Sequence, residues 1–203
     1  MLSYLIYDDF LDDPDAIRQA GLEMEYVENP KMYNFPGRNS VERLTLKGLT
    51  ALVSELVNER LEPAQGTAHG KFRAARSGDE GKANVHIDNA YWSGVLFLSR
   101  PEDCQGGTDF FRHKPTDTER APIYPEDFEK MGLKNGQEFW DKHLTPDTND
   151  PDKWEHILRL PMRYNRLVLF RPWFYHNAGP SFGDCMENCR LVYLLFFRPK
   201  QAG

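Results

Sequence analysis

Three side chains far apart in the chain have the chemistry to bind one metal ion. His86 and Asp88 are separated by a single residue. Side chains alternate between the two faces of an extended strand, so an imidazole and a carboxylate at this spacing point to the same side. A second imidazole would complete the two-histidine, one-carboxylate set that holds non-haem Fe(II) and leaves coordination positions open. His176 is the candidate for it, and these three residues form the predicted metal-binding and catalytic centre.

The His-x-Asp spacing is a weak signal by itself. Asp88 falls in a segment that we expect to be a mostly buried strand, and a buried carboxylate without a partner is energetically costly. A metal ion would remove that cost, and so would a buried arginine. The remaining histidines lie in a turn or in polar sequence, where solvation explains them, and none is predicted to bind metal: His69, His113, His143 and His156.

Arg190 begins a segment in which every second residue is apolar, namely Val192, Leu194 and Phe196. An arginine with such neighbours lies at the rim of a barrel or is buried against an anion. The anion is either an Asp or Glu of the chain or the carboxylate of a co-substrate, which the planar guanidinium can bind with two hydrogen bonds. Arg198 is a second candidate, but it precedes Pro199 at the end of the segment and is expected to face solvent.

The elements that must position these residues are mostly strands. Helices are predicted at 16–24, with Asp13 as the cap and Pro14 as the first helical residue, and at 41–61, with further helical pieces at 125–131 and 137–144. Strands are predicted at 3–7, 71–75, around His86 and Asp88, and at 91–99, 108–111, 164–170, 173–177 and 190–197, and an ordered loop at 29–40. This order indicates an α+β chain with a largely antiparallel core, for which a closed or sandwiched barrel is the natural container.

Composition restricts the class of protein. The 203 residues, 40% of them hydrophobic, suit one domain over 1–203, and the charged, proline-bearing stretch at about 112–160 is expected to be a lid-like insert within it. A formal charge of −6 makes nucleic-acid binding unlikely, and no apolar run has the length of a membrane span. The sparse cysteines, Cys104, Cys185 and Cys189, do not suit a disulfide framework, so we expect a cytoplasmic protein.

Taken together, these motifs resemble the Fe(II)/2-oxoglutarate-dependent dioxygenases, particularly the prolyl-hydroxylase-like branch and a group of small bacterial members of uncharacterised function. The resemblance is carried by His86-x-Asp88, the GVLFLS and GGTDFF segments after it, the NRLVLF segment, His176 and Arg190. The opening YLIYDDFLDDPDAIRQAGL is also similar to the strand-then-helix entry of such proteins. The resemblance covers most of the chain, excluding roughly 114–160.

The resemblance implies a fold and a set of cofactors. The fold is a double-stranded β-helix, a jelly-roll or cupin-like core, with the N-terminal helices packed on one sheet. His86, Asp88 and His176 would hold Fe(II), Arg190 would bind the distal carboxylate of the co-substrate 2-oxoglutarate, and O2 would take a remaining position. Halogenating members of the family have a small residue in place of the carboxylate, so Asp88 favours hydroxylation.

The substrate is predicted only by class. Its candidate contacts are two aromatic residues near the ligands and three arginines able to meet an acidic group: Tyr91, Trp173, Arg73, Arg112 and Arg38. Core packing or solvation explains each of them equally well. The leading hypothesis is hydroxylation of a small molecule, such as an amino acid or a natural-product intermediate. The alternatives are a hydroxylase of peptidyl residues, a metal-binding β-barrel that senses a ligand without turnover, and a hydrolytic zinc site with the same ligands. The oligomeric state is left open.

Overall fold

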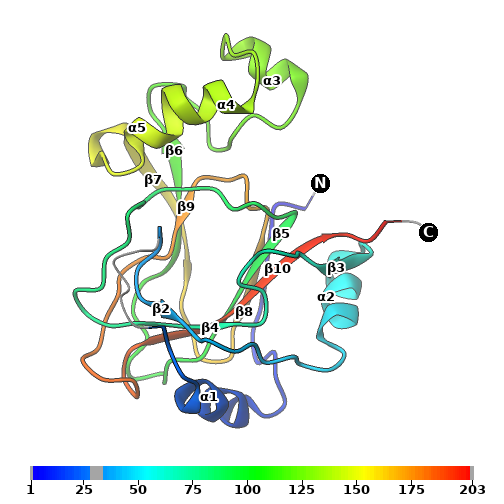
Figure 1. Cartoon of the computed structure of the whole chain (residues 1–203), viewed down its shortest axis with the longest axis vertical. Helices are drawn as coiled ribbons and strands as arrows, with labels where there is room; N and C mark the ends of the chain where they lie inside the picture. The colour runs from blue at the N-terminus through cyan, green and yellow to red at the C-terminus, as the bar shows by residue number, and fades with distance from the viewer. Residues whose placement is uncertain (1, 28–33, 202–203) are drawn as a thin grey trace.

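Two antiparallel sheets form the body of the protein in a computed structural model that describes residues 2–27 and 34–201 (Figure 1). The larger sheet has the order β1-β8-β5-β10-β4-β2, with β3 also pairing with β10, and the smaller one has the order β7-β6-β9. The strands are β1 (Tyr4–Tyr7), β2 (Arg38–Asn39), β3 (Leu61–Pro63), β4 (Phe72–Ala75), β5 (Trp92–Phe97), β6 (Gly107–His113), β7 (Trp154–Pro161), β8 (Leu167–Phe170), β9 (His176–Asn177) and β10 (Arg190–Pro199). The expected α+β chain with antiparallel sheets is therefore observed.

Helices α1 (Pro14–Glu23) and α2 (Leu49–Val57) contribute to the apolar core on the outer face of the larger sheet (Figure 1). The expected start of α1 is confirmed, since the Asp13 carboxylate accepts a hydrogen bond of 3.0 Å from the backbone N–H of Ala16 and Pro14 is the first helical residue. This cap satisfies a backbone donor that the first turn leaves without a partner. A second core lies between the two sheets and includes Phe110 and Val192.

The long helix predicted over 41–61 is wrong at both ends. Gly48 and Asn58 have left-handed backbone conformations, with φ of 83° and 54°, and they bound α2 on either side. Leu44 and Leu46 lie in a loop and pack, partly buried, against the core to which α2 contributes. The apolar spacing therefore predicted correctly that these residues are partly buried, but it did not predict their backbone conformation. The predicted loop at 29–40 is only partly comparable, because 28–33 lie outside the described residues.

The inserted segment is shorter than predicted. Strand β7 lies within the predicted insert, but it pairs with β6 along its whole length and belongs to the smaller sheet. The remaining helices are α3 (Pro125–Lys130), α4 (Gly136–Phe139), a π-helical turn (Trp140–Leu144), α5 (Thr145–Asp147) and a 3₁₀ turn (Pro151–Lys153). They project at one end of the molecule, far from α1 (Figure 1), around a small core of their own that includes Phe139, Trp154 and Tyr175. We call residues 114–153 the lid.

None of the helices in the described ranges combines the length and the apolar character that crossing a bilayer requires.

The contact between α1 and the larger sheet gives a test of the fold. A Cβ atom added at Gly21 would lie 2.7 Å from Cδ1 of Phe72, whose ring is fully buried. Gly21→Ala should therefore lower the free energy of unfolding by about 1–3 kcal/mol through overpacking, in spite of alanine's better helix propensity. Urea unfolding measures this change. Gly136→Ala is the matched control, because no atom lies within 4 Å of its added Cβ, and it should be neutral or slightly stabilising. Equal stability of the two variants would contradict this packing.

Candidate metal centre

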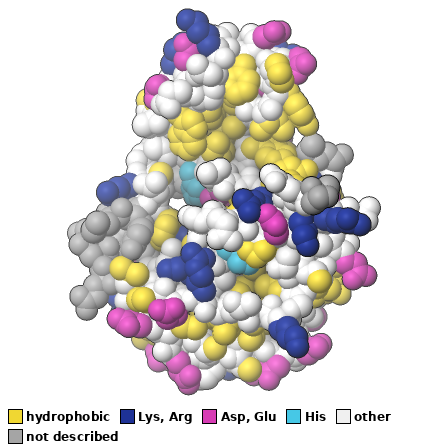
Figure 2. Space-filling model, turned by 45° about the vertical axis from the view of Figure 1, so that its right-hand side comes forward, with side chains coloured by type: hydrophobic (Ala, Val, Ile, Leu, Met, Phe, Trp, Pro, Cys, Tyr) yellow, Lys and Arg dark blue, Asp and Glu magenta, His cyan; other side chains and the backbone are white. Residues whose placement is uncertain are grey.

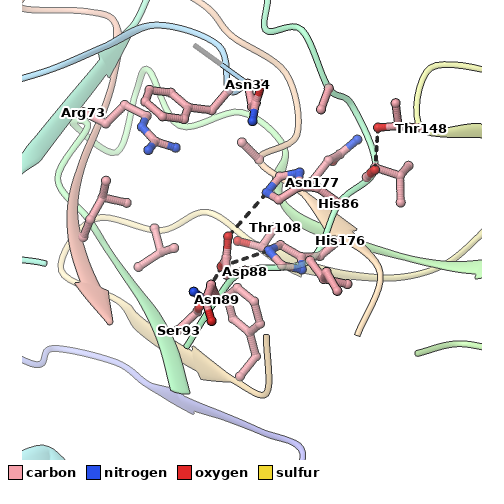
Figure 3. Close-up of a pocket in the computed structure, with 18 of the residues that line it drawn as sticks. Asn34, Arg73, His86, Asp88, Asn89, Ser93, Thr108, Thr148, His176 and Asn177 are labelled. Carbon is pink, nitrogen blue, oxygen red and sulfur yellow. Dashed lines mark hydrogen bonds and ion pairs between the residues drawn. The ribbon is translucent and has the colours of Figure 1, made fainter. Parts of the chain in front are cut away.

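The three predicted ligands meet at one point (Figure 3). The ligating atoms of His86, Asp88 and His176 all lie within 4.8 Å of one another. Nε2 of His176 is 3.3 Å from Oδ2 of Asp88, and Nε2 of His86 is 3.7 Å from Oδ1. Atoms this close can share a single ion, whose bonds to nitrogen and oxygen are about 2.0–2.2 Å long.

The backbone brings them together in a way that differs from the prediction. The segment around His86 and Asp88 is not a strand, and both side chains are partly exposed, at 25% and 22%. His86 instead forms one isolated bridge with His176, with N–H to carbonyl distances of 2.9 Å and 3.0 Å, and the Asp88 N–H bonds to the carbonyl of Pro172 at 3.1 Å. The strand predicted over 173–177 is likewise reduced to the two residues of β9.

Both imidazole rings are oriented by the same kind of hydrogen bond. Nδ1 of His86 lies 2.9 Å from the carbonyl oxygen of Asn84, and Nδ1 of His176 lies 2.8 Å from that of Phe174. A carbonyl can only accept, so each Nδ1 carries a proton and donates it. In the uncharged ring Nε2 then has a free lone pair, and in both residues Nε2 is the atom that faces Asp88. Such bonds are typical of metal-binding histidines.

The protonation states suit a cation. Burial and the neighbouring His176 lower the pKa of His86 to about 4, so its imidazole is uncharged at neutral pH. Burial alone would raise the pKa of Asp88, but the adjacent imidazole of His176 and the Ser93 hydroxyl, 2.6 Å from Oδ2, hold that pKa well below its usual range. The site thus directs one carboxylate and two imidazole nitrogens at one point.

The centre lies in a cavity of about 680 Å³ between the two sheets and the lid (Figures 2 and 3). Strand β10 lines it with residues from one face of the sheet: Arg190, Val192, Leu194 and Phe196. The lid contributes Trp140, Leu144, Thr145, Thr148 and Asn149. The volume lies within the range of about 300–1,000 Å³ that is typical of small-molecule sites.

Arg190 is buried in this cavity, 3% exposed, without a carboxylate partner among the described residues. Its Nε has no hydrogen-bond partner, and its Nη2 lies 3.4 Å from the carbonyl of Gly107. Burial lowers the pKa of Arg190 to about 10, so the guanidinium remains charged at neutral pH. The Thr108 hydroxyl, which also lines the cavity, is likewise buried without a partner. The sequence analysis did not identify Thr108 or Ser93. The signal for Ser93 was a hydroxyl in the otherwise apolar strand β5, whereas β6 also contains Asp109, Arg112 and His113 and gave no such signal for Thr108.

Of the other predicted contacts, Arg73 lines the cavity but Tyr91 and Trp173 do not. Their rings lie instead against the guanidinium of buried Arg171, with centroids 4.3 Å and 5.4 Å from its Cζ. That guanidinium also forms an ion pair with Glu59. The two aromatic residues therefore enclose a buried charge, and the structure does not place them in the cavity of the three candidate ligands.

Arg112 and Arg38 also lie outside this cavity. Arg112 lies outside the cavity and forms an ion pair of 2.7 Å with Glu119. Arg38 pairs in register with Ala74, the residue after Arg73, so it lies on the opposite face of the sheet from the cavity. Arg198 is exposed and bound to Glu62 at 2.7 Å, as expected.

Known proteins share this architecture. The chain is similar to HygX from Streptomyces hygroscopicus, solved with nickel, 2-oxoglutarate and hygromycin B bound; identity is 12%, the TM-score is 0.53, and 98% of this chain and 83% of that chain are covered. A weaker similarity is to a Pseudomonas putida prolyl-4-hydroxylase, with 13% identity and a TM-score of 0.46, over 98% of this chain and 94% of that chain. Another is to an N-substituted L-amino acid dioxygenase from Burkholderia ambifaria, with 14% identity and a TM-score of 0.43, over 98% of this chain and 86% of that chain. The similarity to HygX, which was solved with 2-oxoglutarate bound, confirms the predicted resemblance at the level of the fold.

No curated protein matches the chain. A family model does match it, over residues 2–180, which include all three converging side chains. This chain is therefore a member of DUF6445, a family of unknown function.

Proposed function

We propose that this protein is a non-haem Fe(II)/2-oxoglutarate-dependent oxygenase that hydroxylates a small molecule, and that its two sheets are the halves of a double-stranded β-helix. One observation carries the proposal. The three converging donors and a buried arginine with an unpaired Nε line the same cavity. A sensor or a hydrolytic zinc site would use the donors but would not need the arginine.

The donor set fits Fe(II). His86, Asp88 and His176 supply two imidazole nitrogens and one carboxylate oxygen from one side, which leaves the side facing the cavity open. The bonds from Nδ1 to backbone carbonyls hold both rings in the required tautomer. Ser93 donates to Asp88 and fixes the rotation of its carboxylate.

The two unpaired buried groups fit the distal carboxylate of 2-oxoglutarate. Arg190 is charged and Thr108 is a neutral donor, and both line the cavity that contains the ligand set. A buried guanidinium without an anion is costly, and a carboxylate would accept hydrogen bonds from both groups at once. No carboxylate of the described residues forms an ion pair with Arg190, so a ligand carboxylate in the cavity could supply the anion.

When bound, Fe(II) and 2-oxoglutarate couple the reduction of O2 to oxidative decarboxylation, which gives succinate, CO2 and a hydroxylated substrate. The protein's own residues do the positioning. His86, Asp88 and His176 would hold the metal, Arg190 would orient the co-substrate, and the lid residues that line the cavity would reduce the access of water.

A small substrate is favoured over a polypeptide. The lid forms one wall of the cavity with Trp140, Leu144 and Thr145, and the volume of about 680 Å³ suits a small molecule. An extended chain would need a groove that continues beyond these walls. The lid wall and the volume therefore favour the small-molecule hypothesis over the peptidyl one.

The first test removes a ligand. With Fe(II), 2-oxoglutarate and O2, the wild-type protein should form succinate, slowly without substrate. Asp88→Ala should weaken Fe(II) binding by at least about tenfold, since even residues behind the ligands affect metal affinity by 10–100-fold, and succinate formation should fall accordingly. Anaerobic Fe(II) titration and chromatography of succinate measure the two effects. Asp12→Ala, on an exposed carboxylate outside the cavity, is the control. Unchanged Fe(II) affinity in Asp88→Ala would exclude this metal site.

The second test concerns the co-substrate. Arg190→Met should raise the KM for 2-oxoglutarate by roughly 30-fold to several thousandfold, since truncating one partner of a buried charged pair costs about 2–5 kcal/mol. Thr108→Val should raise it by roughly 2- to 12-fold, the effect of one neutral hydrogen bond. Initial rates of succinate formation over a range of 2-oxoglutarate concentrations measure both.

Arg198→Met, on the same strand but exposed, should leave this KM unchanged. An unchanged KM in Arg190→Met, with Fe(II) binding intact, would remove Arg190 from this role.

A further inference from the structure

The cavity is basic although the protein as a whole is acidic. The chain has a formal charge of −6, yet Arg73, Lys82 and Arg190 line the cavity. Among the described residues, Asp88, one of the three candidate ligands, is the only acidic one that lines it. A bound divalent cation would make the cavity more positive still. Such a surface attracts anions and disfavours cationic ligands.

Arg73 is the second guanidinium of this cavity, and most of its donors are unused. Its Nε donates to Oδ1 of Asn39 at 2.8 Å, and its Cζ lies 3.4 Å from the centroid of the Phe35 ring. No Asp or Glu of the described residues forms an ion pair with it. The bond to Asn39 and the stacking on Phe35 fix the plane of the guanidinium, and both Nη groups are left to bind a ligand. Figure 3 shows Arg73 projecting into the cavity across from the three candidate ligands.

The two arginines are neighbours on one sheet face. Arg73 lies opposite Val192 on the adjacent strand, and Arg190 is two residues before Val192, so the two side chains are diagonal neighbours. Burial lowers the pKa of Arg73 to about 9; the charge of Asp88 opposes this shift and the charge of Arg190 adds to it. Two like charges held this close inside a cavity are stable when each has its own anion. Under the proposed function the co-substrate supplies one of them.

Part of the cavity wall is apolar. Trp140 of the lid lines the cavity although its side chain is 42% exposed, and Leu144 lies one helical turn further on. Val85 and Ile87, on either side of His86 in sequence, also line the cavity. Figure 2 shows hydrophobic side chains gathered above the hollow in which a histidine is visible. An exposed tryptophan over a polar pocket is a suitable contact for the apolar part of a ligand.

We infer that the substrate is a small carboxylic acid with an apolar body, whose carboxylate pairs with Arg73 and whose body lies against Trp140 of the lid. This inference rests on the proposed function, because it assigns the second anion of the cavity to the molecule that is hydroxylated. A carboxylate suits Arg73, since a planar guanidinium with two free Nη groups matches a planar carboxylate with two oxygens.

The inference is tested by binding of three matched probes with one body: 3-phenylpropionate, 3-phenylpropionamide and 3-phenylpropylamine. The protein is loaded anaerobically with Fe(II) and saturated with 2-oxoglutarate, so that the site at Arg190 is filled, and binding is followed by calorimetry. The acid should bind roughly 10- to 100-fold more tightly than the amide, as one charge-assisted hydrogen-bonded pair allows. The amine should bind most weakly. An acid that binds no more tightly than its amide overturns the inference.

Variants then locate the anion. Arg73→Met should lower the affinity for the acid to that for the amide, and Arg73→Lys, which keeps the charge but loses the planar fork, should restore part of the loss. The affinity for 2-oxoglutarate should change far more in Arg190→Met than in Arg73→Met. Arg38→Met is the matched control, on the other face of the same sheet, and should bind the acid like the wild type. Equal losses of acid and of 2-oxoglutarate in Arg73→Met would assign Arg73 to the co-substrate and overturn the inference.

The apolar contact has its own measurement. Trp140→Ala should weaken binding of 3-phenylpropionate by about tenfold and leave the weak binding of acetate unchanged, because acetate has no body to place against the lid. Equal effects on both acids would exclude the lid contact. These binding experiments need no turnover, so they are separable from the proposed function. Acid binding that depends on Arg73 without any O2-dependent succinate formation would refute the oxygenase and leave the anion site standing.

Discussion

The structure depends on a convergence of electron-rich atoms. Two backbone carbonyls take the Nδ1 protons of His86 and His176, and this turns each Nε2 toward the ionised carboxylate of Asp88. The Nε2 atoms lie 3.7 Å and 3.3 Å from the carboxylate oxygens of Asp88, so the three groups are close enough to share one cation. The reciprocal backbone bonds between His86 and His176 maintain this arrangement. The fold therefore holds the three groups together through its own hydrogen bonds.

Strand β10 organises the rest of the cavity. It pairs with β5 on one side and with β3 and β4 on the other, so it is held at the centre of the larger sheet. Because side chains alternate between the two faces of a strand, one set of residues of β10, every second one from Arg190 to Phe196, faces the cavity. The register with β4 places Arg73 beside that set. The charges of the cavity thus follow from the pairing of two strands, and they are arranged for anions that the described residues do not supply.

The sequence was sufficient to predict the site where the chemistry itself imposed a pattern. His86, Asp88 and His176 were found because two imidazoles and a carboxylate are a recognisable ligand set, and Arg190 because a charge in an apolar strand needs an explanation. The elements were less well predicted. Helical spacing of apolar residues over 41–61 could not reveal that Gly48 and Asn58 take left-handed conformations. Strand β7 was not predicted because its charged residues hide the alternation that is typical of a strand.

Tertiary packing decided where the other predicted contacts lie. Tyr91 and Trp173 were chosen for their nearness in sequence to the ligands, but the structure packs both rings against buried Arg171, which also pairs with Glu59. Which charge an aromatic residue encloses is decided by tertiary packing. Thr108 was missed for the same reason, since its importance comes from the burial of an unpaired hydroxyl beside Arg190, which only the fold produces.

The central claim is that the side chains at 86, 88 and 176 hold one ferrous ion. The most direct measurement is an anomalous difference map at the iron absorption edge, from crystals grown anaerobically with Fe(II) and 2-oxoglutarate. The account predicts a single peak at about 2.0–2.2 Å from Nε2 of both histidines and from one carboxylate oxygen of Asp88. A map with no peak between these residues, or with the peak on other side chains, would contradict it.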